Sequence, residues 1–171
     1  MIPFFCVSCY YYYGEIMLRK VLKLLLIVFW MGLIFVFSMD NNYESSRKSE
    51  SLILQFSKFV LRDHYTEEKG FEILDKMETP VRKSAHFLLY LFLEIWVLWF
   101  LSEFYKLTIK GYIIATLITF IYACSDEFHQ LFVSGRSGEV LDVFIDTIGG
   151  SVGALFYYLR RKKYEQKKAI G

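Results

Sequence analysis

The sequence predicts an all-α integral membrane protein: a bundle of about four transmembrane helices with an amphipathic helical loop outside the membrane. Of its 171 residues, 55% are hydrophobic and 19% aromatic, and the mean hydropathy is +0.33. The apolar residues form four blocks of nearly 20 residues, about the length that crosses a hydrocarbon layer of roughly 30 Å. Three of these blocks are apolar on nearly every face, which disfavours a soluble bundle.

The first transmembrane helix is expected at about residues 21–39. Met17 opens a short basic stretch followed by an apolar run, the ordinary start of a membrane-inserted protein. Residues 1–16 are therefore interpreted as an extension that comes from a false upstream start in the gene model, and residues 1–20 as a cytoplasmic N-terminus. No cleavage motif of small residues follows Phe37, which favours an uncleaved helix over a signal peptide.

The loop at residues 40–83 is expected to contain helices of its own. One apolar face recurs there at helical spacing, formed by Leu52, Ile53, Phe56, Phe59 and Val60. Such a helix would lie on the outer leaflet or cover the bundle. Thr66, followed by Glu67 and Glu68, indicates the N-cap of a second short helix.

Three further transmembrane helices are expected at about 80–101, 107–125 and 140–159. Thr79 and Pro80 are typical of an N-cap and a first helical position, so the second transmembrane helix is predicted to begin near Pro80. The membrane domain then covers residues 21–159, and residues 160–171 form a basic tail.

Basic residues in the short flanks predict the orientation in the membrane. They precede the first helix, separate the second from the third and follow the fourth, at Arg19, Lys20, Lys23, Lys106, Lys110, Arg160, Arg161, Lys162, Lys163, Lys167 and Lys168. By the positive-inside rule both termini are cytoplasmic, and residues 40–83 and 126–139 lie outside.

Charge and cysteine content exclude several function classes. A net charge of +2, without a basic run interleaved with aromatic residues, argues against a nucleic-acid partner. Three cysteines cannot form a disulfide framework. Cys6 and Cys9 form a C-x-x-C motif, but the sequence around it lacks a second pair and a βαβ pattern, so no redox or zinc site is predicted there.

Polar residues recur on one stripe of each of the last three predicted helices. Successive positions are three or four residues apart: Lys83, His86, Tyr90 and Glu94; then Tyr122, Asp126 and His129; then Asp142 and Asp146, continued by Gly149, Gly150 and Gly153. An ionisable residue at a membrane helix centre costs about 2.5–3.5 kcal/mol. Convergence of these stripes at one depth, near the outer boundary, therefore predicts a site.

Two interpretations of this site involve a ligand or a reaction. In the first, the site binds an anionic lipid headgroup or cell-wall precursor through Lys83, Glu127, Gln130, Arg136 and Asp146. In the second, a hydrolase or transferase uses His86, Asp126, His129 and Asp142 as its catalytic groups. In a metal-dependent form of the second interpretation, the two histidines and neighbouring carboxylates would bind zinc or manganese. These residues have no recognised metal spacing, so neither metal nor cofactor is predicted.

Two other interpretations remain open. Proton-coupled transport would use the deep carboxyl of Glu94 with a histidine–carboxylate relay. Alternatively, the polar network only fastens the helices together, as in a structural accessory protein. Gly149 and Gly153 form a small-residue stripe on the fourth helix, which predicts close helix packing and a homo-oligomer through that face.

The run from Lys83 to Gly153 resembles the VanZ-like family of small bacterial membrane proteins. The resemblance rests on three fragments in order: Lys83-Ser84-Ala85-His86 with Tyr90; Asp126-Glu127-Phe128-His129-Gln130 with Gly135-Arg136; and Asp142, Asp146 and Gly149-Gly150. This chain departs from the family pattern at Ser134, where proline is frequent, and at Asp146, where asparagine is common. The resemblance implies a four-helix protein of the bacterial cell envelope, in a family associated with low-level teicoplanin resistance.

Overall fold

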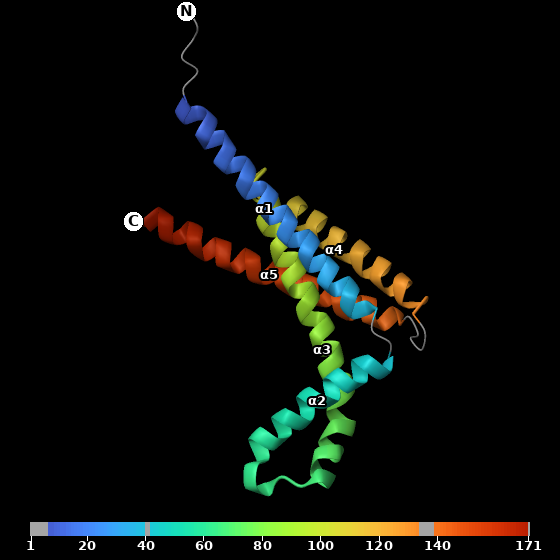
Figure 1. Ribbon diagram of the computed structural model, residues 1–171. Helices are drawn as coiled ribbons and strands as arrows, with labels where there is room; N and C mark the ends of the chain where they lie inside the picture. Colours follow the sequence, from blue (N-terminus) through green and yellow to red (C-terminus); the bar gives the residue numbers. More distant parts are fainter. Residues whose placement is uncertain (1–6, 40–41, 134–138, 171) are drawn as a thin grey trace, which may run out of the picture.

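The computed structural model describes residues 7–39, 42–133 and 139–170, and over these ranges every regular element is a helix (Figure 1). The helices are α1 (Val7–Ser38), α2 (Asn42–Leu61), α3 (Glu67–Leu101), α4 (Ile109–Gln130) and α5 (Val140–Ile170), with a 3₁₀ turn at Arg62–His64. The predicted all-α class is confirmed.

Four of these helices are long and apolar enough to cross a membrane: α1, α3, α4 and α5. Their outward faces expose large apolar side chains such as Phe29, Ile113 and Phe144. A protein in water would cover so continuous an apolar surface, whereas lipid solvates it. The chain is therefore a multi-pass membrane protein, as the sequence predicts.

Helix α3 lies at the centre of the molecule and packs against each of the other four helices. Its buried residues Tyr90, Leu93, Val97 and Leu98 form the middle of the core, which Ile34 of α1 and small residues of α4 and α5 complete. The polar stripes predicted from the sequence therefore lie on α3 itself or on helices that pack against α3.

Gly149 and Gly153 bring α5 into backbone contact with α3. A methyl group at Gly149 would overlap the carbonyl oxygen of Phe87, and one at Gly153 would overlap that of Leu91. The expected close packing is therefore present, but it is used within the chain. The predicted homo-oligomer contact through this face is wrong, because α3 of the same molecule already fills it.

The N-terminal half of α3 and all of α2 form a helical hairpin that projects from the bundle (Figure 1). Thr66 caps α3 as expected, its hydroxyl accepting a hydrogen bond from the backbone N–H of Lys69 at 3.3 Å. The second transmembrane helix was expected near Pro80, but α3 runs unbroken from Glu67 through that proline. Pro80 removes one helical hydrogen bond, and packing of α2 on the preceding turns explains why the helix persists there.

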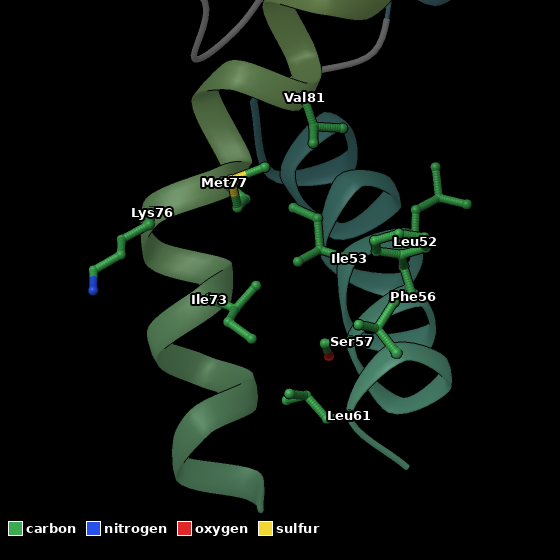
Figure 2. Close-up of a pocket in the computed structure, with 10 residues that line it drawn as sticks. Leu52, Ile53, Phe56, Ser57, Leu61, Ile73, Lys76, Met77 and Val81 are labelled. Carbon is green, nitrogen blue, oxygen red and sulfur yellow. The ribbon is translucent and has the colours of Figure 1, made fainter. Parts of the chain in front are cut away.

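The amphipathic helix predicted in the loop exists as α2, but most of its apolar face is exposed. Ile53 is buried against α3, whereas Leu52, Phe56 and Phe59 are 64%, 68% and 69% exposed. Between the two helices runs an apolar groove of about 490 Å³, which Figure 2 shows with side chains from both walls.

Both helices on the C-terminal side extend beyond their predicted ends. The third transmembrane helix was expected to end near residue 125, but α4 continues to Gln130 and so carries the acidic pair in its last turns. The tail from residue 160 is helical rather than irregular, since α5 continues to Ile170. Lysine, arginine and glutamate favour helix, and Arg161 pairs with Glu165 one turn later at 3.1 Å.

Candidate functional site

The candidate site lies where α3, α4 and α5 meet at the end of the bundle that carries the hairpin. At its rim, the Lys83 ammonium donates hydrogen bonds to Asp142 at 3.0 Å and to Glu139 at 3.4 Å. Glu139, which directly precedes α5, thus takes part in an ion pair at the rim of the site. Lys83 is thus held between two carboxylates that belong to the start of α5 or directly precede it.

One turn deeper, His86 of α3 faces Asp146 of α5. Nδ1 of the imidazole and Oδ1 of the carboxylate are 3.7 Å apart, within ion-pair range but longer than a direct hydrogen bond. Asp146 is 1% exposed. A histidine beside a buried carboxylate is an arrangement that can take up and release a proton.

The innermost part of the cluster combines Tyr90, Asp126 and Gln130. The Gln130 amide donates to Asp126 Oδ2 at 3.4 Å and to the Ser38 hydroxyl of α1 at 3.3 Å. Tyr90 is fully buried, and its hydroxyl interacts electrostatically with both Asp126 and Asp146. These contacts place residues from four helices around one buried point.

Several oxygen atoms at this point lack ordinary hydrogen bonds. Tyr90 Oη, Asp126 Oδ1 and Asp146 Oδ1 are buried, yet none has a hydrogen-bond partner of normal geometry among the described residues. Most buried polar groups in proteins have such a partner, supplied by protein or by ordered water. Water or a polar group of a ligand would complete the hydrogen bonding of these oxygens.

Glu127 has an internal role, although it directly follows Asp126. One of its carboxylate oxygens accepts a hydrogen bond from the backbone N–H of Glu139, at the start of α5. Adjacent residues of a helix point in different directions, so Asp126 enters the cluster while Glu127 joins the end of α4 to the start of α5. The geometry gives Glu127 a helix-capping partner rather than a free ligand position.

His129 of α4 packs against α1. Its imidazole packs on Phe35 of α1 with ring centroids 4.4 Å apart, and its Nδ1 is buried without a hydrogen bond to a described residue. Arg136 lies outside the described residues, as do Cys6 and the side chain of Cys9.

Glu94 lies two turns below His86 and is fully buried. It accepts hydrogen bonds from the hydroxyls of Thr119 at 2.6 Å and Thr116 at 3.0 Å, both on α4. Two hydroxyl donors satisfy the carboxyl and tie α3 to α4. The contacts therefore favour the structural hydrogen bond over the proton-relay alternative for Glu94.

Sequence reasoning missed the contribution of α1. Ser38 at its end reaches Gln130, the Trp30 indole donates to the carbonyl of Leu89 at 2.9 Å, and Tyr122 donates to the carbonyl of Met31 at 2.6 Å. Two of these bonds end on backbone carbonyls, which carry no sequence signal. A serine ending an apolar segment is likewise too common to mark a site.

Carboxylates outnumber cations in the described part of the site. Asp126, Glu127, Glu139, Asp142 and Asp146 accompany a single lysine and His86. The arrangement offers hydrogen-bond acceptors at the centre and a cation at the rim. Among the described residues, no group of three histidine, cysteine, aspartate or glutamate side chains is placed to hold a metal ion.

Comparison with known proteins gives one result. The sequence profile described as VanZ/LLP1 matches residues 23–161, which include the whole candidate site. Comparison with curated proteins and with solved structures gives no match.

Proposed function

The chain belongs to the VanZ-like family, and on that premise we propose that it binds the polar head of a lipid-linked, anionic envelope molecule at the outer membrane boundary. The ligand class is an anionic lipid headgroup or a lipid-linked cell-wall precursor. The observation that carries this proposal is the set of buried oxygens without ordinary partners, at Tyr90, Asp126 and Asp146.

The charges around the cluster favour a ligand of mixed character. Lys83 at the rim would attract a phosphate or carboxylate of the ligand, joined by Arg136 of the segment between α4 and α5. The central carboxylates would accept hydrogen bonds from hydroxyl, amide or ammonium groups. An acidic headgroup that also carries sugars, amides or amines offers both, whereas a bare anion would be repelled by the carboxylates.

The apolar groove of the hairpin supports the lipid-linked part of the proposal. Val81 lines this groove (Figure 2), and it is only two residues, about 3 Å of helix rise, from Lys83. An acyl or prenyl chain in the groove would place an attached head near Lys83.

A specific observation favours a second candidate function. His86 beside the buried Asp146 has the composition of a general-base pair, so a hydrolase or transferase acting on the same ligand class is the alternative. A role limited to fastening helices is the third, supported by the internally satisfied Glu94 and Glu127.

The test uses a bacterial host that lacks the native protein, and teicoplanin susceptibility is the phenotype that we propose for it. Asp146→Asn and His86→Gln are compared with Asp75→Asn, an exposed carboxylate of the hairpin. Membrane abundance, melting temperature in detergent, teicoplanin susceptibility and the profile of lipids and cell-wall precursors are measured for each.

We expect the two site variants to accumulate and melt close to wild type while the phenotype is lost, and Asp75→Asn to behave as wild type. Retained bound lipid that disappears in both variants would support binding. Accumulation of an unprocessed precursor would favour the enzyme. Loss of folded protein without any other change would leave only the helix-fastening role and overturn the proposal.

A further inference from the structure

A small basic pocket lies at the opposite end of the bundle from the candidate site. It has a volume of about 160 Å³, and its polar and aromatic lining consists of Lys106, Tyr112, Tyr158, Arg161, Lys162 and Glu165. These residues come from the segment before α4, the first turns of α4 and the last third of α5. Arg161 is nineteen residues after Asp142 on α5, a separation of roughly 28 Å along the helix.

The walls of the pocket hold its shape through aromatic and ionic contacts. The rings of Tyr112 and Tyr158 meet edge to face with centroids 5.8 Å apart. Nε of Arg161 donates to Glu165 at 3.1 Å. This contact uses the inner nitrogen of the guanidinium, so the two terminal nitrogens remain available on its other edge.

The charge of the pocket suits a single phosphate group. Three cations face one carboxylate, and that carboxylate is already paired with Arg161. The planar guanidinium fork matches phosphate oxygens, and two lysines supply further positive charge. The first turn of α4 contributes the positive end of its helix dipole to the same region.

The position of the pocket favours a membrane source for that phosphate. Tyrosines in its walls are typical of the boundary between hydrocarbon and water. Six of the twelve residues from 160 to 171 are lysine or arginine, and such clusters next to a transmembrane helix attract anionic lipids.

We propose that this pocket binds a phosphate group, carried by an anionic lipid headgroup of the leaflet that faces the C-terminal tail. Free inorganic phosphate has the same chemistry, and the experiment separates the two sources. The basic end of α5 is then part of a defined binding pocket and does not attract lipids only through its overall positive charge.

The experiment uses the full-length protein in detergent and native mass spectrometry. Short-chain phosphatidylglycerol, short-chain phosphatidylcholine and inorganic phosphate are each titrated. The pocket variant is the pair Arg161→Gln and Lys162→Gln. The matched control, Lys163→Gln with Lys167→Gln, removes the same charge from the same helix at positions that do not line the pocket.

The pocket variant should bind phosphatidylglycerol about tenfold more weakly, the effect of losing one strong charge-assisted contact. The control should bind it nearly as wild type does. Lys106→Gln, on a different element, should also weaken binding. Glu165→Gln should strengthen it, because this variant removes the one carboxylate that repels the ligand.

Preference for phosphatidylglycerol over inorganic phosphate assigns the site to a lipid headgroup, and equal affinity assigns it to phosphate from either source. Equal losses in the pocket and control variants would show diffuse attraction and overturn the site. No binding above that of phosphatidylcholine would also overturn it. Melting temperatures of all variants identify any loss caused by misfolding, and Glu165→Gln tests the site by a gain that misfolding cannot produce.

Discussion

Single atoms decide how closely α3 and α5 approach. At Gly149 and Gly153 the absence of a side chain lets the α5 backbone rest on the carbonyl oxygens of Phe87 and Leu91. In a membrane, where lipid is as apolar as leucine, such close packing is a main source of helix association. The contact also sets the distance between His86 on α3 and Asp146 on α5.

Replacing Gly149 with alanine should destabilise the fold by about 1–3 kcal/mol, because the new methyl group meets backbone atoms that cannot rotate away. The free energy of unfolding in mixed detergent micelles measures the change. Gly32→Ala is the matched control, since nothing lies within 4 Å of the added methyl group there. It should be neutral or stabilising, because alanine favours helix. Equal effects in both variants would contradict the packing argument.

At the scale of elements, an ion pair joins α1 to the end of α3, at the end of the bundle opposite the candidate site. Lys23 is 4% exposed, and its ammonium contacts Glu103, the carbonyl of Trp99 and the Trp99 ring. Glu103 is therefore the carboxylate that neutralises a buried lysine of another helix.

Stability should depend on pH through this pair. The hydrogen bond from Lys23 holds the pKa of the Glu103 carboxyl below its usual value of 4.5. A carboxyl with a lowered pKa in the folded state binds its proton more readily when unfolded. Its contribution is therefore complete above pH 4.5 and is lost as the pH falls through the lower, folded-state value.

Glu103→Gln should lower the free energy of unfolding by about 1–3 kcal/mol at neutral pH, since it leaves Lys23 without a counter-charge. The difference from wild type should shrink as the pH falls below 4.5. Melting curves recorded from pH 3 to pH 7, in steps of about half a pH unit, measure this difference in stability. Glu72→Gln, which breaks an exposed pair with Lys76, should have no measurable effect. A constant difference across the range would contradict the ion-pair explanation.

At the scale of the whole molecule, four spans place the start of α1 and the end of α5 at the same end of the bundle (Figure 1). The α2–α3 hairpin lies at the opposite end with the candidate site. The basic flanks predict that the hairpin is outside the cell, and this orientation stays a prediction.

Cysteine labelling tests the orientation. In a background where Cys6, Cys9 and Cys124 are replaced by alanine, Glu68→Cys on the hairpin should react with a membrane-impermeant maleimide in intact cells. Gln166→Cys on the tail should react only after the membrane is opened. The reverse pattern would move the candidate site to the cytoplasmic face and contradict an extracytoplasmic ligand.

The residues of the site illustrate what a sequence alone can predict. Helical spacing was sufficient to place Lys83, His86 and Tyr90 on one stripe, and Asp142 and Asp146 on another, because i, i+3 and i+4 positions share a face in any helix. Which stripes face one another depends on the tertiary structure. In the folded chain Asp126 bonds to Gln130, Glu127 bonds to the start of α5 and His129 packs on Phe35, because the rotation of a helix about its axis depends on its neighbours.

By itself, the sequence determined that this protein is helical, has four segments long and apolar enough to cross a membrane and carries polar stripes on the last three of them, since block length, periodicity and charge are local properties. Only the tertiary structure decided that α3 continues through Pro80, that the Gly149–Gly153 face packs inside the chain and that Lys23 meets Glu103. Each of these depends on which distant segment supplies the contact, and no local pattern carries that information.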